Sequence, residues 1–460
     1  MIEIKEQVET LLEEAIQTLR SDNDARLVSI TKKITEADPL RFFEAAKNRY
    51  EDRTFWTSTI EDFYLVGVGN AYQMIATESR YKVTEEKWNS ILAEAIVHNP
   101  YQVAGTGIVA LGGMDFDPKK ERTSLWHKYQ ASDFTLPELL LTKRNGDFYF
   151  TSNIQVQKND DAKQLADGLK RAETELFSNQ PIAFNDLVVQ EKEVIEPEQW
   201  KASVRTATAD IRKSNLEKIV LAREVRVKFN KEANIAPILN DLIQTQPHSY
   251  IFAFEKGMDC FVGATPERLV KLENDQLLST CLAGTAPRGK TIQEDLKISQ
   301  DLLQDEKNRQ EHDFVVQMIK AGIKNYCTNL EIPEEPVIYP LKNLQHLYTP
   351  VTGTLKKDYS IFDIVKQLHP TPALGGTPKE AALTYIRDHE LLDRGWYGAP
   401  IGWLDSNQNG EFAVAIRSGL IQQDQASLFA GCGVVKDSDP EAEYEETNIK
   451  LLPMLSVLGG

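Results

Sequence analysis

Two stretches of the chain decide the fold: SYIFAFEKGMDCFVGAT (residues 249–265) and ERLVKLENDQLLSTCLAGT (residues 267–285). Each contains two apolar runs separated by a polar or glycine-containing turn, which is the pattern of a β-hairpin. Successive hairpins make antiparallel sheet, because parallel strands need a long crossover between them. KIVLAREVRV (218–227) predicts a further strand before them, and residues 399–435 predict three more near the C-terminus.

The N-terminal half has the same mixture of strand and helix patterns. Residues 136–156 (LPELLLTKRNGDFYFTSNIQV) carry Asn145-Gly146 between apolar runs, which favours a tight hairpin turn. The spacing of apolar residues predicts helices near 1–20, 83–97, 160–178 and 197–213, and two between 291 and 325. The sequence therefore predicts an α+β fold in which large antiparallel sheets carry helices on the outside.

The length of 460 residues allows two or three domains, but the sequence offers no place to divide them. No linker rich in Pro, Ser or Gly and no block of like charge separates the two halves. We therefore expect one interlocked domain over residues 1–460.

Composition and charge exclude several classes of function. A net charge of −17 opposes nucleic-acid binding, because a nucleic-acid surface must replace counterions with Lys and Arg. The N-terminus lacks the basic start of a signal peptide, and no window reaches 18 consecutive apolar residues. The four cysteines are too widely spaced for a zinc site and too few for a secreted disulfide scaffold. We expect a folded cytoplasmic protein with no nucleic-acid partner and no membrane contact.

One motif suggests a nucleotide enzyme. Residues 284–291 (GTAPRGKT) match the phosphate-loop pattern G-x-x-x-x-G-K-[ST]. However, Pro287 lacks the N–H group that such a loop directs at phosphate, and the strand before the motif belongs to an antiparallel hairpin. This nucleotide-binding alternative stays open, and it predicts that Lys290 contacts ATP.

Carboxylates on two predicted helices favour a different site. Glu443 and Glu446, with Lys450 four residues further on, lie along one helical face that follows the glycine-rich strand FAGCGVV. Glu311 lies on another helix, whose opposite face is apolar. Carboxylates with open positions between them suit Mg²⁺, and the His/Cys sets that would favour zinc are missing. On surface helices such residues are usually solvated charges, so their grouping is the informative feature.

Nine motifs between residues 190 and 456 occur in the order and spacing of the chorismate-utilising enzymes, which the chain resembles. They are KIVLAR (218–223), FVGATPERL (261–269), LAGTAPRG (282–289), NRQEHDFVV (308–316), LQHLYTPVTG (344–353), LHPTPALGGTPK (368–379), WYGAPIGW (396–403), VAIRSGL (414–420) and AGCGVVKDSDPEAEYEETNIK (430–450). The family includes isochorismate synthases, salicylate synthases and the large subunits of anthranilate and aminodeoxychorismate synthases. The resemblance implies the α/β/β/α sandwich of anthranilate synthase component I, with 190–456 as the catalytic part and 1–189 as a more variable part.

The resemblance also implies residue roles. Lys218 would be the general base that activates water for attack at C2 of chorismate, and Glu267 the general acid that protonates the departing C4 hydroxyl. Glu311 and Glu446 would bind Mg²⁺, with Glu443 nearby through water. The substrate site would be lined by Gly284, Thr285, His346, Ala373, Tyr397, Arg417, Gly431, Gly433 and Lys450, and the segment carrying His369 would form a neighbouring wall.

Three positions separate the branches of the family. Lys218 is typical of members that use water, whereas the ammonia-using anthranilate synthases lack this lysine. Ala283 stands where aminodeoxychorismate synthases often carry Lys, and Ala373 stands where salicylate synthases tend to carry Thr. The N-terminal part is closest to the longer, menaquinone-type isochorismate synthases.

We therefore expect an Mg²⁺-dependent isomerase that converts chorismate to isochorismate reversibly. We expect it to work as a monomer or weak dimer without an amidotransferase subunit. A salicylate synthase is the alternative, and an anthranilate or aminodeoxychorismate synthase component is a more remote one.

Overall fold

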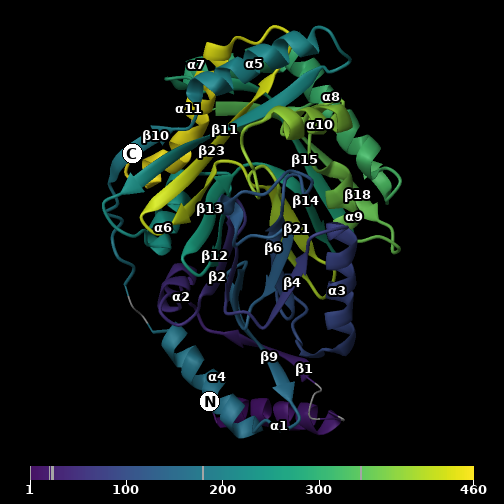
Figure 1. Ribbon diagram of the computed structural model, residues 1–460. Helices are drawn as coiled ribbons and strands as arrows, with labels where there is room; N and C mark the ends of the chain where they lie inside the picture. The colour runs from purple at the N-terminus through teal and green to yellow at the C-terminus, as the bar shows by residue number, and fades with distance from the viewer. Residues whose placement is uncertain (1, 20, 22–24, 179–180, 342–343) are drawn as a thin grey trace.

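The computed structural model describes residues 2–19, 21, 25–178, 181–341 and 344–460, with side chains from residue 8 onward. Within these residues the strands form two large sheets, which lie face to face with helices on both outer sides (Figure 1). The predicted α+β sandwich is confirmed.

The first sheet has 13 strands in the described part of the chain, paired antiparallel except for β1 with β5. Its strands, in spatial order, are β10 (Val189–Val194), β11 (Lys218–Phe229), β23 (Gln425–Val434), β22 (Ser418–Gln422), β13 (Asp259–Thr265), β12 (Tyr250–Lys256), β2 (Asp52–Ser58), β3 (Phe63–Val68), β8 (Leu139–Arg144), β9 (Asp147–Gln157), β1 (Ala25–Ile34) and β5 (Ile96–His98), while β19 (Gly376–Thr377) pairs with β11.

The second sheet has 10 strands within the described ranges. In order they are β16 (Cys327–Glu331), β18 (Leu344–Leu355), β15 (Gln276–Pro287), β14 (Arg268–Glu273), β21 (Gly410–Val414), β20 (Pro400–Asp405), β6 (Val109–Met114), β7 (Ser132–Leu136) and β4 (Tyr72–Ala76), while β17 (Val337–Pro340) pairs with β18.

The predicted hairpins occur where the sequence places them. The stretch 249–265 forms β12 and β13, and the stretch 267–285 forms β14 and most of β15. Asn145 and Gly146 both have positive φ, 51° and 83°, as a tight turn between β8 and β9 requires. These elements follow from local patterns, because turn residues and alternating apolar residues are close together in sequence.

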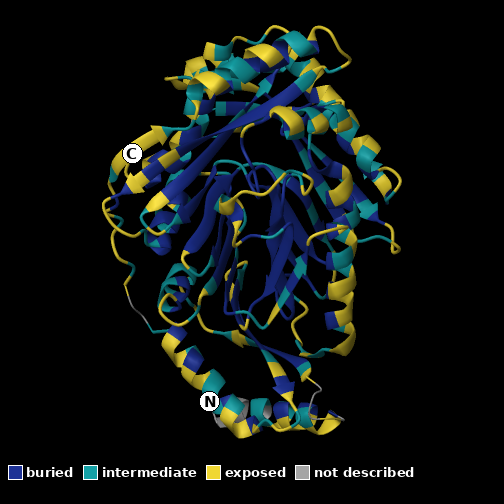
Figure 2. Ribbon diagram, viewed as in Figure 1, coloured by how far each residue is buried: buried dark blue, intermediate teal, exposed yellow. Residues whose placement is uncertain are grey.

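The helices cover the outer faces of the two sheets. They are α1 (Ile2–Thr18), α2 (Pro39–Ala45), α3 (Arg80–Glu94), α4 (Ala162–Leu176), α5 (Pro197–Ile211), α6 (Ile235–Thr245), α7 (Ile292–Gln304), α8 (Glu306–Ile323), α9 (Ile361–Leu368), α10 (Lys379–His389) and α11 (Pro440–Val457). Helices α3, α8 and α9 contact the second sheet, whereas α2, α6 and α11 contact the first. Figure 2 shows both sheets buried beneath these partly exposed helices.

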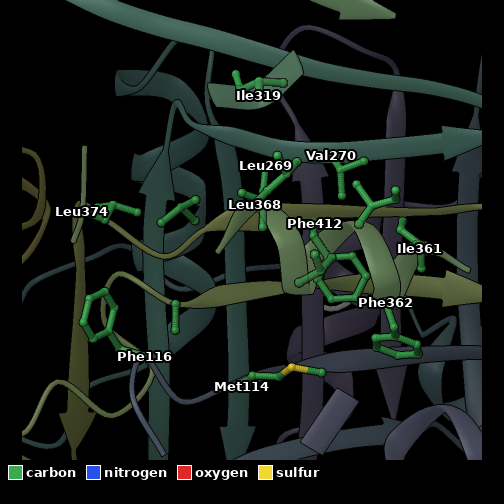
Figure 3. Close-up of a cluster of buried hydrophobic side chains, with 14 of the residues drawn as sticks. Met114, Phe116, Leu269, Val270, Ile319, Ile361, Phe362, Leu368, Leu374 and Phe412 are labelled. Carbon is green, nitrogen blue, oxygen red and sulfur yellow. The ribbon is translucent and has the colours of Figure 1, made fainter. Parts of the chain in front are cut away.

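Apolar side chains fill the spaces between the layers. Aromatic residues such as Trp56, Phe252 and Trp403 occupy the core between the sheets. Helix α9 contributes Phe362 to a second core, where it packs against Phe412 of β21 (Figure 3). Burial of this apolar surface is the main stabilising contribution that holds the layers together. The four cysteines are buried and unpaired.

None of the helices in the described residues is long and apolar enough to cross a membrane.

In each sheet the strands of residues 25–157 form one continuous block, which is joined edge to edge to the block formed by the strands from residue 189 onward. In the first sheet β12 pairs with β2, and in the second β20 pairs with β6. We propose on this basis that residues 1–460 fold as one unit.

We predict that a fragment of residues 190–460 does not form a stable fold. Removing residues 1–189 would expose the edges of β12 and β20 and leave their backbone groups unpaired. Near-ultraviolet circular dichroism and thermal unfolding test this, with the full chain expected to unfold in one transition. A fragment with a cooperative transition of its own would contradict the proposed single unit.

Candidate active site

The predicted site residues come from both sheets and from two helices at one end of the molecule. The first sheet contributes Lys218, Gly431 and Gly433, and the second contributes Gly284, Thr285 and His346. Helix α8 carries Glu311, and helix α11 carries Glu443, Glu446 and Lys450 (Figure 1). Connecting segments carry the remaining three predicted binding residues, Ala373, Tyr397 and Arg417, and the predicted acid Glu267.

Lys218 begins β11 and crosses the neighbouring strand β23. A Cβ atom on Gly433 would lie 2.6 Å from Cε of Lys218, so a larger residue at this position would displace the lysine side chain from where it lies. Nζ of Lys218 then reaches helix α8 and donates to Oε1 of Glu311 at 3.0 Å. The strand pairing therefore connects a predicted base with a predicted metal ligand 93 residues later in the chain.

Glu267 lies in the short turn between β13 and β14. Its carbonyl accepts from the Val414 amide at 3.0 Å, and its Oε1 accepts from the Thr371 hydroxyl at 3.3 Å. Burial raises the pKa of Glu267 from 4.5 to about 7, against the opposing effects of Thr371 and the cations Arg417, Lys450 and Lys218. This carboxyl group therefore holds a proton near neutral pH while cations surround it.

Arg417 lies at the centre of the charged groups. Its φ of 51° is in the left-handed region, which is uncommon for a residue other than glycine, and its carbonyl accepts from the Ala264 amide at 3.1 Å. Burial lowers the pKa of Arg417, whereas Tyr397, Glu446 and Glu267 act in the opposite direction. The guanidinium is therefore close to residues from three separate predicted motifs.

Two uncharged polar groups border the same space. Burial, reinforced by Arg417, lowers the pKa of His346 to about 4, so its imidazole is neutral at pH 7. Its Nδ1 lies 3.0 Å from the hydroxyl oxygen of Thr285, which is its cross-strand neighbour. Burial likewise raises the pKa of Tyr397 to about 12, so its phenol keeps its proton. Both groups are available for hydrogen bonding without carrying charge.

The carboxylates of α11 lie beside the glycine-rich end of β23. Lys450 donates to the Gly431 carbonyl at 2.9 Å and forms an ion pair with Glu446 at 2.5 Å. Burial raises the pKa of Cys432 well above its usual value, and the negative charge of Glu443 acts in the same direction. The end of β23 and helix α11 are thus neighbours, as the strand-to-helix connection predicts.

The carboxylates present suit a magnesium ion. The described residues contain no group of three or more His, Cys, Asp or Glu placed to hold a metal. Mg²⁺ needs fewer, because it keeps several waters and binds through one or two carboxylates plus substrate oxygens. The side chains of Glu311 and Glu446 are 46% and 51% exposed, and their ion-pair partners are site lysines. Two accessible oxygen donors of this kind fit the predicted ion, which stays a prediction.

Ala373 and His369 lie in the segment that follows α9. Ala373 is within a turn in which the Leu374 amide donates to the Thr371 carbonyl at 3.0 Å. His369 is 4% exposed, and its Nε2 lies 3.1 Å from the Phe116 carbonyl oxygen. His369 thus joins this wall to the N-terminal part of the chain.

Two residues of the site escape the sequence analysis. Thr371 bonds the carboxyl group of Glu267, and Asn308 accepts from the Thr285 amide at 3.2 Å. Both lie inside motifs quoted from the sequence, but single hydroxyl and amide side chains have no characteristic spacing. Only their long-range contacts reveal them.

The phosphate-loop alternative is excluded by the geometry of residues 284–291. The motif continues from an antiparallel strand, β15, and the amides of Gly289 and Lys290 are already bonded. The Gly289 amide donates to Oδ1 of Asp295 at 2.7 Å, and the Lys290 amide donates to Oε2 of Glu294 at 2.8 Å. Acidic side chains from α7 therefore occupy the positions where such a loop would bind phosphate.

Comparison with known proteins places this geometry in a family. Residues 14–459 match the family model described as "Chorismate binding enzyme". Isochorismate synthase MenF of Bacillus subtilis is 42% identical over 97% of this chain and 96% of its own. The salicylate biosynthesis isochorismate synthase of Pseudomonas aeruginosa is 35% identical over 94% of this chain and 91% of its own.

Solved structures share the fold. MenF, the menaquinone-specific isochorismate synthase from Escherichia coli, superposes with a TM-score of 0.81 at 24% identity, covering 99% of both chains. Anthranilate synthase component I from Streptococcus pneumoniae has a TM-score of 0.71 at 20% identity, covering 96% of both. With a family model that spans nearly the whole sequence and close relatives of full length, the chain belongs to the chorismate-binding enzyme family.

Proposed function

We propose that the protein is an isochorismate synthase that interconverts chorismate and isochorismate. The observation that carries this proposal is that Lys218 acts electrostatically on Glu267, a buried carboxyl group on which Arg417 and Lys450 also act. Lys218 offers an amine, and Glu267 offers a carboxyl group that keeps its proton up to about pH 7. A base and an acid of these two kinds are what an allylic exchange of hydroxyl groups requires.

The reaction balances with these two groups and solvent, which takes the proton from Lys218 and returns one to Glu267 after each turnover. Lys218, in its neutral form, takes a proton from water as the water oxygen bonds to C2 of the ring. The two conjugated double bonds of the ring shift together, from C1=C2 and C5=C6 to C6=C1 and C4=C5, the bond between C4 and its hydroxyl breaks, and Glu267 donates a proton so that the leaving group departs as water. One water enters and one leaves, so the net change is an isomerisation, and the reverse reaction uses the same groups with their roles exchanged.

Substrate binding depends on a local excess of positive charge. Chorismate is a dianion, whereas the whole chain carries a net charge of −17. Arg417, Lys450 and Lys218 all act on Glu267, so three cations converge on the proposed binding space. Glu311 and Glu446 would hold Mg²⁺, with Glu443 nearby, and the ion would supply further positive charge for the ring carboxylate.

Water rather than ammonia is the proposed nucleophile. A reaction that uses water needs no second subunit to generate ammonia, so we propose a stand-alone enzyme, a monomer or weak dimer, in the cytoplasm. Ala283 and Ala373 support isochorismate as the released product, since neither provides the side chain that the covalent-amine or pyruvate-eliminating branches tend to carry at these positions. The similarity to menaquinone-type relatives over nearly the full length supports menaquinone biosynthesis as the pathway.

We predict that the protein with Mg²⁺ converts chorismate to isochorismate as its single product. Liquid chromatography of the reaction mixture separates isochorismate, salicylate with pyruvate, and anthranilate. Lys218→Ala should lower kcat by about 10² to 10⁴, which is the range of one proton-transfer group. Formation of salicylate, a requirement for ammonia, or full activity in Lys218→Ala would contradict the proposal.

We predict that Glu267→Gln stabilises the fold while it removes activity. A carboxyl group whose pKa rises on folding destabilises the folded state once it ionises, so the cost grows as pH rises from 4.5 towards 7. A shift from 4.5 to about 7 corresponds to about 3 kcal/mol at alkaline pH. Urea unfolding should therefore show a larger stabilisation by Glu267→Gln at pH 8 than at pH 6.

Glu61→Gln is the matched control for this measurement. Although burial opposes it, the hydrogen bond from Lys271 lowers the pKa of Glu61, so the carboxylate is the favoured form. Its replacement should lower the free energy of unfolding at both pH values. Equal effects of the two substitutions would contradict the environment proposed for Glu267.

We predict that Glu311→Gln and Glu446→Gln each weaken Mg²⁺ binding on the order of tenfold or more, because each removes an anionic ligand. Isothermal titration with Mg²⁺ measures this without any turnover. Glu445→Gln is the control, since Glu445 is exposed on the same helix and its carboxylate bonds Asn448 at 3.3 Å instead. Unchanged affinity in both Glu311 and Glu446 variants would contradict the proposed metal site.

A further inference from the structure

We propose that Glu390 and Arg394 are positioning residues that hold the strand of the base Lys218 and the wall of the site in their reactive arrangement. The inference rests on the proposed function. It starts from a buried ion pair behind β11, outside the residues that line the site and unmarked by any motif analysed above.

The ion pair is fully enclosed. The two side chains are 2% and 3% exposed, and Nε and Nη2 of Arg394 donate to the two carboxylate oxygens of Glu390 at 2.6 and 2.7 Å. The planar guanidinium matches the carboxylate in a two-pronged contact that lysine cannot reproduce. Replacing a buried ion pair by apolar groups is often neutral or stabilising, so stability alone does not explain it.

The pair completes a stretch of the β11 edge that no strand among the described residues covers. On this edge β19 pairs with Lys218 and Ile219, and β10 resumes the pairing at Val225. Between them, the Ala222 amide donates to Oε2 of Glu390 at 2.7 Å, and Nη2 of Arg394 donates to the Val220 carbonyl at 2.8 Å.

Other segments pair the remaining backbone groups on this edge of β11. The Val220 amide donates to the Gly375 carbonyl at 3.1 Å, and Trp200 donates to the Ala222 carbonyl at 3.1 Å. Because buried backbone groups must be paired, the ion pair takes the place of a strand beside the residues that follow Lys218. The ion pair thereby holds in place the segment of β11 that directly follows the base Lys218.

Arg394 also holds two other walls of the site. Its Nη1 donates to the Leu374 carbonyl at 3.0 Å, which fixes the turn containing Ala373 and Thr371, the partner of Glu267. Its carbonyl accepts from the Tyr397 amide at 2.8 Å.

The guanidinium is fixed from a further side by the N-terminal part of the chain. It lies 4.2 Å from the ring centroid of Phe116, and Figure 3 shows Phe116 and Leu374 at the same end of their apolar cluster. One side chain thus connects the segments that carry the base, the partner of the acid, and Tyr397.

Misplacement of reacting groups by about 1 Å costs on the order of 10²-fold in rate, even when the change is remote from the chemistry. Shortening the contact through Arg394→Lys should therefore reduce kcat by about that factor. The KM for chorismate should change much less, because Arg417 and Lys450 are untouched. Affinity for Mg²⁺ should be retained, since Glu311 and Glu446 lie on α8 and α11.

The chain provides a closely matched control in the same sheet. Arg53 and Glu255 form an equally two-pronged ion pair with side chains 2% and 10% exposed, and Arg53 lies 4.2 Å from the ring centroid of Phe43. This pair is beside the hairpin at the start of β13, whereas Glu267 follows the other end of that strand. Arg53→Lys therefore removes comparable packing at a distance from the site.

The test compares kcat, KM, Mg²⁺ affinity and urea unfolding of the parent protein, Arg394→Lys and Arg53→Lys. Similar losses of stability in both variants, with a loss of kcat on the order of 10²-fold confined to Arg394→Lys, support the proposal. Glu390→Gln is a second variant, which tests the proposal if Arg394→Lys does not fold. It keeps a side-chain oxygen that can accept from the Ala222 amide, so we expect a smaller loss of kcat in the same direction.

Two results would overturn the inference, and they are distinguishable. If the parent protein converts chorismate but Arg394→Lys or Glu390→Gln loses no more kcat than Arg53→Lys, the pair is only structural and the proposed function stands. If the parent protein does not convert chorismate, the proposed function fails and the inference fails with it.

Discussion

Strands β11 and β23 pair from Ile219 opposite Val434 to Lys228 opposite Gln425, and the site depends on this register. The pairing brings Lys218 beside Gly433, where the lysine side chain crosses the strand in the space that a larger residue would fill. A shift of one residue would turn the side chains of β11 to the opposite face of the sheet and separate the lysine from Glu311. The buried hydrogen bonds of Glu390 and Arg394 to the backbone of β11 help to hold the strand in this register.

Charge within the site differs from charge over the whole molecule. The net charge of −17 describes the surface, whereas three cations act on Glu267 in the interior. Their attraction would favour the carboxylate, but desolvation outweighs it and leaves the carboxyl group protonated up to about pH 7. The same burial keeps His346 neutral, so the polar wall near the proposed leaving group adds no charge of its own. The net charge therefore argues against a nucleic-acid partner but gives no information about the pocket.

The N-terminal part of the chain acts as a support for the catalytic part. It supplies β2 and β6 as partners of β12 and β20, and Phe116 contacts both His369 and Arg394 beside the site. A region can vary in sequence and still keep such a role, because strand pairing depends on backbone groups and packing tolerates apolar substitutions of similar volume.

The sequence by itself predicted the elements that depend on neighbouring residues: the hairpins 249–265 and 267–285, the Asn145-Gly146 turn, and the helices that carry Glu311 and Glu446. Its ordered motifs also predicted the family. Only the tertiary structure decided that Lys218 bonds Glu311, that Thr371 bonds Glu267, and that the amides of residues 284–291 are occupied by Asp295 and Glu294. Likewise, nothing in the sequence marks Glu390 and Arg394 as more than a pair of opposite charges. Their role is visible only in the folded chain, where Glu390 accepts from the amide of Ala222, 168 residues earlier. The physical reason is that turns and amphipathic helices are encoded over a few residues, whereas the desolvation and hydrogen bonding of a site depend on segments that meet only after folding.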